Sequence, residues 1–326
     1  MRKLVVLLLL LVGLAALAAV GLLWWTGTPN TAPKGGSFHV VVAEGTSLTA
    51  VSRQLETKSL INGTAKTWRL MAQLLGSHDP IQAGEFEIPV GTSGAKILDI
   101  LQHGSPVQRL MTIPEGMPSI MVQERLAALP FATGPAPLPA EGSVLPDSYS
   151  YERGEPRAAI LKRATDAMSR TIDALWARRA PTTVATSKAE AITLASIVEK
   201  ETSKPAERST VAGVYSNRVR IGMKLDADPT VIYPITRGKP LGRRILRSEL
   251  DADNGYNTYR RAGLPAGPIA NPGKASIAAV LNPAPTKALY FVADGTGGHV
   301  FAETLDEQNA NVAKWFALRR ERGEIK

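Results

Sequence analysis

The feature that most constrains this chain is an uninterrupted apolar run near its N-terminus. From Leu4 to Trp25 the sequence reads LVVLLLLLVGLAALAAVGLLWW and carries no charge. A helix of that length would extend roughly 33 Å, enough to cross a hydrocarbon core of about 30 Å. The sequence therefore predicts a transmembrane segment over residues 4–25, preceded by a short tip at residues 1–3.

A cleaved signal peptide is the alternative interpretation of this run. Arg2 and Lys3 supply a basic start, and ALA at residues 16–18 resembles a cleavage site. The run continues to Trp24 and Trp25, however, and paired tryptophans are typical of a membrane interface. The pattern favours an uncleaved anchor. The two basic residues predict a cytoplasmic N-terminus, with the rest of the chain exported.

Composition excludes several classes of function. The chain has no cysteine and only four histidines, which are scattered, so no metal centre or other cofactor is predicted. The net charge is +9, which would suit nucleic acid, but export argues against that partner. An anionic envelope polymer or an anionic membrane surface is the expected partner. The histidines are His39, His78, His103 and His299.

Two folded regions are expected after the anchor. Residues 26–37 are rich in Gly, Pro and Thr and predict a flexible linker. Residues 38–105 predict a small α+β module with the order strand, helix, helix, strand, helix. Residues 106–326 predict a larger mixed α/β domain that contains an αα-hairpin. VAEGTSLTAVSRQL and IPEGMPSIMVQERL align without gaps, which suggests a repeated strand–turn–helix unit.

The stretch LASIVEKETS contains two glutamates with different expected environments. In a helix, Glu201 continues the apolar face of Leu194, Ile197 and Val198. Glu199 lies about 200° away around the axis and is expected in water. Burial raises the pKa of a carboxyl group, which suits a general acid. The alternative is a purely structural role, in which Glu201 pairs with an arginine such as Arg208 or Arg218.

The next helix, PAERSTVAGVYSNRVRIGM, presents Val211, Val214, Tyr215 and Val219 on its apolar face. It is followed by loops rich in Asp, Asn, Tyr and Gly, which suit the recognition of a sugar. Turn formation is the competing explanation for Asn257 and Asp228. The candidate substrate-binding residues are Asn217, Asp228, Thr230, Tyr256, Asn257 and Tyr259.

Four ordered stretches carry a resemblance to a known family. ASIVEKET, NRVRIGMKLDADPTVIY, YNTYRRAGLPAGPIANPG and LYFVADGTGGHVFAETLDEQN together resemble the YceG-like family of endolytic murein transglycosylases. The resemblance implies that Glu201 is catalytic and that residues 38–105 form a LysM-like module in contact with peptidoglycan. It also implies a bacterial inner-membrane protein with an extracytoplasmic catalytic domain at residues 106–326. Asp226 departs from the pattern, since a neutral polar residue is expected there.

The chemistry implied by this resemblance needs one carboxyl group and no cofactor. Glu201 would protonate the oxygen between MurNAc and GlcNAc, then deprotonate the MurNAc C6 hydroxyl to close a 1,6-anhydro ring. Such a polysaccharide lyase would act in cell-wall synthesis and organisation, including termination of glycan elongation, with peptidoglycan synthases as possible partners. Two alternatives stay open. One is a non-catalytic scaffold that recruits synthases, and the other is hydrolysis with Asp226 or Asp228 as second carboxylate.

Overall fold

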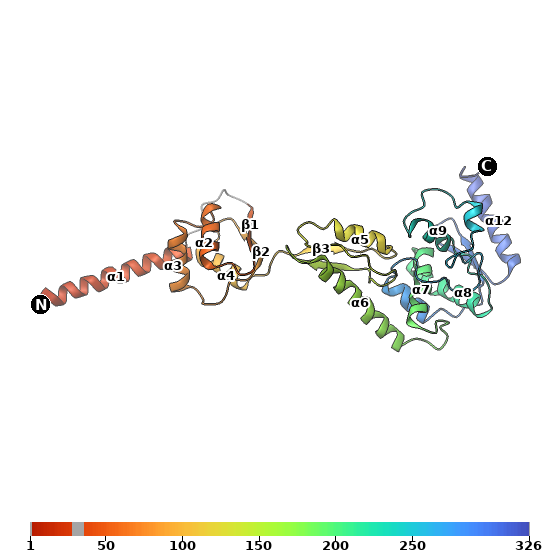
Figure 1. Ribbon diagram of the computed structural model, residues 1–326, viewed down its shortest axis with the longest axis horizontal. Coiled ribbons are helices and arrows are strands. Elements are labelled where there is room, and N and C mark those ends of the chain that lie inside the picture. The colour runs from red at the N-terminus through yellow and green to blue at the C-terminus, as the bar shows by residue number, and fades with distance from the viewer. Residues whose placement is uncertain (1, 28–35, 326) are drawn as a thin grey trace. The chain divides into compact units, whose positions relative to one another are not determined.

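The computed structural model describes residues 2–27 and 36–325, which divide into two compact units (Figure 1). The first comprises Met1–Arg109 with Glu152–Gly154, and the second comprises Leu110–Tyr151 with Glu155–Lys326. Both units combine helices with short two-stranded sheets. The prediction of a mixed α/β chain headed by one long apolar helix is therefore confirmed.

That apolar helix, α1 (Arg2–Gly27), is exposed along most of its length but not at its end. Among the described residues, it alone is long and apolar enough to cross a membrane. Trp25 in its last turns is only 3% exposed, and its ring lies 5.9 Å from that of Trp68. The end of α1 is thus part of the first unit's core. Of the predicted linker at 26–37, residues 28–35 lie outside the described residues.

The rest of the first unit has the predicted order of elements. They are β1 (Ser37–Val42), α2 (Leu48–Thr57), α3 (Ala65–Leu75), β2 (Gly84–Pro89) and α4 (Gly94–His103). The two strands pair antiparallel, from Ser37 opposite Pro89 to Val42 opposite Gly84. Phe86 and Ile88 are both fully buried, as residues two apart on one face of a strand can be. Ser47 caps α2 by accepting the Ala50 N–H at 3.2 Å.

The second unit begins with a similar strand–turn–helix segment. β3 (Arg109–Thr112) starts at the unit boundary and pairs with β4 (Ser148–Tyr151), and α5 (Ser119–Ala127) follows it. The Glu-Gly turns before α2 and α5 have the same backbone, with φ of +74° at Gly45 and +72° at Gly116. Glycine adopts this left-handed conformation without steric cost. The two segments that align in sequence therefore share their local structure.

The remaining elements surround one central helix. That helix is α7 (Lys188–Glu201), and all residues from Ala191 to Val198 are buried. It packs against α6, α8, α9 and α11 in one hydrophobic core. The sequence predicted a single buried face, whereas α7 is enclosed on all sides. The other elements are α6 (Arg157–Ala177), η1 (Pro205–Glu207), α8 (Arg208–Arg220), α9 (Asp228–Thr236), α10 (Arg247–Leu250), α11 (Lys274–Leu281), β5 (Tyr290–Ala293), β6 (His299–Ala302) and α12 (Leu305–Glu321).

Candidate active site

The candidate catalytic glutamate is placed by the length of α7. Ser187 caps the helix by accepting the Glu190 N–H at 3.1 Å, and the chain leaves helical geometry at Thr202. Glu201 is therefore the last helical residue, four and three positions after the fully buried Ile197 and Val198. Its side chain is partly exposed, at the edge of the core. A carboxyl group in this position is accessible to a ligand while most of its surroundings are protein.

The environment of Glu201 raises its pKa to about 7, and burial is the main cause. A hydrogen bond from Tyr215 acts in the opposite direction, as do the charges of His299 and Arg218. The negative charge of Asp228 raises the pKa further. The direction of the shift is the one that the apolar spacing predicted. At neutral pH both protonation states of Glu201 are populated.

Tyr215 is a hydrogen-bond partner of Glu201 that the sequence analysis did not identify. It lies on α8, is 1% exposed, and stands edge-on to Phe291 at 5.8 Å between ring centroids. Its hydroxyl hydrogen-bonds Glu201, and burial raises the tyrosine pKa well above its ordinary value. Sequence analysis counted Tyr215 only as part of an apolar face. The available signal was a hydroxyl within an otherwise aliphatic stripe on the helix that follows the glutamate.

Asp228 and Tyr259 form a second polar pair near Glu201. Asp228 is the first residue of α9, and the Tyr259 hydroxyl donates to its Oδ1 at 2.6 Å. Burial is the main cause that raises the Tyr259 pKa, and the charges of Asp228 and Glu201 add to it. The structure therefore brings two predicted substrate-binding residues together with the candidate catalytic glutamate.

Two further candidates hold the loops behind this pair. The Asn257 amide nitrogen donates to the carbonyls of Leu250 at 3.0 Å and Ala252 at 2.8 Å. Its Oδ1 accepts the Tyr259 N–H at 2.9 Å. Thr230 is fully buried, and its hydroxyl lies 2.8 Å from that of Thr258. For Asn257 the alternative of turn chemistry describes its contacts, and these contacts orient Tyr259.

The last two candidates face other parts of the second unit. The Asn217 amide donates to the carbonyls of Thr286 at 2.8 Å and Ala288 at 3.0 Å, which ties α8 to the segment before β5. Tyr256 packs on Tyr233 at 4.8 Å between ring centroids. It also lines a separate cavity of about 250 Å³ in the loop at residues 255–266.

The prediction that Glu199 lies in water is wrong. Its side chain is 5% exposed and accepts from Arg208 at 3.3 Å and from the Gly273 N–H at 2.8 Å. Arg208 also donates to Glu115 at 2.8 Å. The physical reason is tertiary packing, which brings Arg208 and the backbone of Gly273 against this side of the C-terminal turn of α7. An ion pair with Arg208 exists, but its partner is Glu199 and not Glu201.

Arg218 occupies the other side of the site. It donates to the carbonyls of Leu225 and Leu289, each at 2.7 Å, and lies 3.8 Å from the Asp226 carboxylate. Asp226 has a φ of +49°, a conformation that Asn and Asp adopt more readily than other side chains. This backbone explains why either a neutral amide or an aspartate fits the position.

A histidine–glutamate pair completes the surroundings of Glu201. His299 Nδ1 lies 2.8 Å from Glu207 Oε2, and Glu207 also accepts the His299 N–H at 3.1 Å. The Thr202 hydroxyl, next to Glu201 in the chain, donates to Glu207 at 3.3 Å. Sequence analysis treated His299 as one of four isolated histidines. Within residues 2–27 and 36–325, no group of three His, Cys, Asp or Glu side chains is arranged to hold a metal ion.

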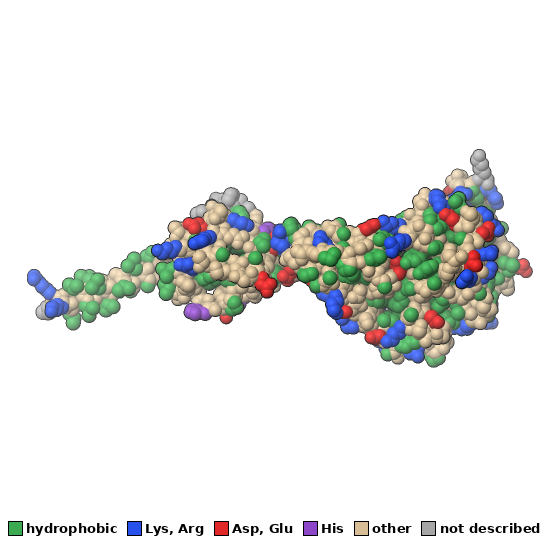
Figure 2. All heavy atoms as spheres, viewed as in Figure 1, with side chains coloured by type: hydrophobic (Ala, Val, Ile, Leu, Met, Phe, Trp, Pro, Cys, Tyr) green, Lys and Arg blue, Asp and Glu red, His purple; other side chains and the backbone are tan. Residues whose placement is uncertain are grey.

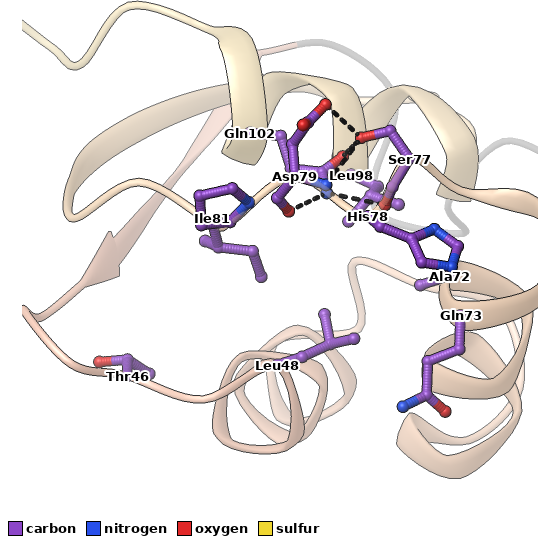
Figure 3. A pocket seen from close by; sticks show the side chains of 11 residues that line it. Thr46, Leu48, Ala72, Gln73, Ser77, His78, Asp79, Ile81, Leu98 and Gln102 are labelled. Atoms are coloured by element: carbon purple, nitrogen blue, oxygen red, sulfur yellow. Dashed lines mark hydrogen bonds between the residues drawn. The ribbon is translucent and has the colours of Figure 1, made fainter.

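A separate cavity of about 590 Å³ lies in the first unit, between the loop before α2 and the segment before β2 (Figure 3). Its polar wall is braced by Gln102, whose amide donates to the carbonyls of Ser77 at 3.1 Å and Asp79 at 2.6 Å. Leu48 and Ile81 supply apolar surface. Mixed apolar and polar lining of this kind is typical of ligand sites.

Comparison with known proteins assigns the chain to a family. The model of the YceG-like family matches residues 40–314. An endolytic murein transglycosylase of Bacillus subtilis is 40% identical over 131 residues, which cover 40% of this chain and 36% of that protein. One of Streptococcus pneumoniae is 30% identical over 195 residues, which cover 58% and 34%. The chain thus spans little more than a third of these relatives.

A solved structure shows a similar fold. It is that of a putative yceG-like protein from Listeria monocytogenes, with 26% sequence identity and a TM-score of 0.53. The match covers 84% of this chain and 98% of the other. The likeness in three dimensions therefore extends over most of both chains.

Proposed function

Because this chain belongs to the YceG-like family, we propose that it is an endolytic lytic transglycosylase that cleaves the MurNAc–GlcNAc bond within nascent peptidoglycan strands. The observation that carries the proposal is Glu201. It is a partly buried carboxyl at the end of α7, with a pKa of about 7. General acid–base catalysis is most effective when the pKa lies near the working pH.

In the proposed mechanism, Glu201 acts twice. As the neutral acid it donates its proton to the glycosidic oxygen, and the bond from MurNAc C1 to that oxygen breaks. As the carboxylate it then removes the proton from the MurNAc C6 hydroxyl, whose oxygen bonds to C1 and forms the 1,6-anhydro ring. The enzyme regains its proton and no water is consumed. A second carboxylate that activates water, as in hydrolases, is therefore not needed.

The neighbours of Glu201 support this cycle. Tyr215 donates a hydrogen bond to Glu201 and so stabilises the carboxylate that forms after proton transfer. The negative charge of Asp228, held by Tyr259, would favour the positive charge that develops on the sugar ring. We assign Asp228 and Tyr259 to the glycan-facing surface. Thr230 and Asn257 would position that surface through the loops they hold.

The proposal includes the location of the protein, which α1 would anchor in the membrane. The apolar run continues past Ala18 to Trp24 and Trp25, and paired tryptophans suit a membrane interface, which supports retention of α1. Arg2 and Lys3 would stay in the cytoplasm, with the LysM-like module at residues 38–105 and the catalytic domain at residues 106–326 outside the bacterial inner membrane. The cavity beside Leu48 and Gln102 would contact glycan (Figure 3).

A second candidate function is a non-catalytic scaffold that binds peptidoglycan and recruits synthases. The cavity in the first unit favours it, because that cavity could bind glycan without any chemistry at Glu201. A third candidate function is hydrolysis with Asp226 or Asp228 as second carboxylate. Asp226 lies 3.8 Å from Arg218, and the charge of Asp228 acts on Glu201.

Product analysis separates the three functions. The full chain is incubated with uncrosslinked nascent glycan strands, and new chain ends are identified by mass spectrometry. The proposal expects 1,6-anhydroMurNAc ends from the wild type and none from Glu201→Gln. Reducing MurNAc ends would identify a hydrolase. Strand binding without new ends would identify a scaffold.

A further inference from the structure

Helix α3 exposes a row of leucines that the module's core does not use. Its sequence is AKTWRLMAQLL, and Trp68 and Ala72 are buried on one face. Leu70 and Leu74, one turn apart, are 52% and 67% exposed, and Leu75 is 46% exposed. An isolated exposed leucine is ordinary, but three on one short helix form an apolar surface.

This surface adjoins the part of α3 that packs on the anchor. The Met71 Cε lies only 3.3 Å from where a Cβ on Gly21 of α1 would stand, and Trp25 packs on Trp68. Leu74 follows Met71 by three residues and therefore lies beside it on the helix surface. Figure 1 shows α3 at the end of the module from which α1 emerges.

The length of α1 fixes the level of α3 relative to a bilayer. The apolar run from Leu4 extends roughly 33 Å by the time it reaches Trp25, and a hydrocarbon core is about 30 Å thick. Trp25 lies inside the module. If α1 spans the membrane, the module must rest directly on the bilayer with α3 at the interface.

The charges of α3 match such a position. Lys66 and Arg69 are its only charged residues, and α3 contains no acid. Figure 2 shows Lys and Arg side chains over this end of the module. Basic side chains near a membrane surface attract anionic phospholipid headgroups, and leucines on the same helix favour burial at the acyl boundary.

We propose that α3 is an interfacial membrane helix, which inserts Leu70, Leu74 and Leu75 into the outer leaflet of the bilayer that α1 spans. Lys66 and Arg69 lie among anionic headgroups. The inference rests on the proposed anchor. Ala72 and Gln73 of the same helix line the cavity of Figure 3. That cavity is then held within about one helix diameter, roughly 10 Å, of the lipid.

The absence of cysteine allows a direct test with single spin labels. The full chain is prepared as Leu74→Cys, as Ala83→Cys and as Leu10→Cys, and is reconstituted in nanodiscs that contain phosphatidylglycerol. Ala83 is an exposed residue before β2, and Leu10 lies within the apolar part of α1. Accessibility to oxygen, which is enriched in lipid, is compared with accessibility to a water-soluble nickel complex.

The expected result is a lipid-type ratio at positions 74 and 10, several-fold above that at position 83. A water-type ratio at position 74 with a lipid-type ratio at position 10 would overturn the inference and leave the anchor intact. A water-type ratio at position 10 would show that α1 is not inserted, so the proposed anchoring itself would fail. Shielding of position 74 by added glycan strands in detergent without lipid would also overturn the inference, since it would assign the leucines to peptidoglycan.

Discussion

The two sides of the last turn of α7 make opposite use of the same chemical group. Glu199 and Glu201 are two residues apart; the Glu199 side chain is buried, and Glu201 is partly exposed at the edge of the core. Glu199 receives a guanidinium from Arg208 and a backbone N–H from Gly273. Glu201 receives a tyrosine hydroxyl, and its pKa rises to about 7. Burial alone thus does not define a catalytic acid, because the partners that accompany the burial differ between the two glutamates.

The largest expected effect is on activity and comes from substitution of Glu201. Glu201→Gln keeps the shape of the side chain but removes the transferable proton, so the rate of anhydroMurNAc release should fall by about 10²- to 10⁴-fold. Release is measured by mass spectrometry, with circular dichroism as a check of the fold. Glu199→Gln is the matched control and should retain far more activity per folded molecule. Equal activity of the two variants would break the comparison.

The pH dependence of the wild type sharpens the same point. Glu201 must start protonated, so kcat/KM should be highest below its pKa and fall about tenfold per pH unit above about 7. The groups that face it are Tyr215, Asp228, His299 and Arg218. The readout is the initial rate between pH 5 and 9 in buffers of constant ionic strength. A rate that rises throughout this range would contradict a general-acid role.

Substitution of Glu199, which is paired with Arg208, is expected to affect stability. Glu199→Ala leaves the mostly buried Arg208 without its partner inside the core and a backbone N–H unsatisfied. Breaking a buried pair typically costs about 3–5 kcal/mol. Arg208 keeps its contact with Glu115, so a loss of about 2–4 kcal/mol is expected in chemical denaturation. A loss as small as that of an exposed pair, such as Lys162→Ala beside Asp166, would show that the network is not structural.

Removal of the Tyr215 hydroxyl tests the hydrogen bond that this residue donates to Glu201. Tyr215→Phe removes a hydrogen bond that lowers the Glu201 pKa. The alkaline limb of the pH profile, where kcat/KM falls as the pH rises, should therefore move to higher pH. The carboxylate formed after proton donation would be less stable, and kcat should fall about tenfold. Tyr149→Phe removes a hydroxyl that donates to the Leu145 carbonyl, and it should leave the limb unchanged. An unmoved limb in Tyr215→Phe would exclude its direct role.

The smallest expected effect is a gain in stability. The Glu201 pKa is higher in the folded chain than the ordinary 4.5, so folding penalises its ionised form. That penalty is absent below about pH 4.5, grows as the pH rises and is complete above about pH 7. Glu201→Gln should therefore raise stability at pH 8 by about 1–3 kcal/mol and have little effect at pH 4. Thermal unfolding at both pH values measures the difference, and equal effects would contradict the raised pKa.

Much of the fold could be predicted because its determinants are local. The charge-free run predicts α1, and the spacing of Leu194, Ile197 and Val198 predicts both the course of α7 and the burial of Glu201. The environment of Glu199 could not be predicted this way. Helical spacing identifies one buried face, whereas the packing of α11 and the loop at Gly273 against the other side is decided by tertiary structure.

The candidate site shows the same division. Asp228 and Tyr259 were identified from loop composition, but composition could not distinguish them from Asn257 and Thr230, which hold the loops. His299 and Glu207 are 92 residues apart in the chain, and nothing in either sequence context predicts their contact. Such pairs form only when β6 packs beside η1, so a local pattern contains no information about them.

The burial of Trp25 has a practical consequence for anyone who handles this protein. A soluble version is usually made by starting the chain after the hydrophobic segment. Here that cut would leave a hole against Trp68 and Gly94 in the first unit, at a cost of about 3–5 kcal/mol if the hole does not collapse. If the truncated protein aggregates or binds glycan poorly, the cause would then be the loss of Trp25 from the core of the first unit. A start a few residues before Trp24 would keep that residue.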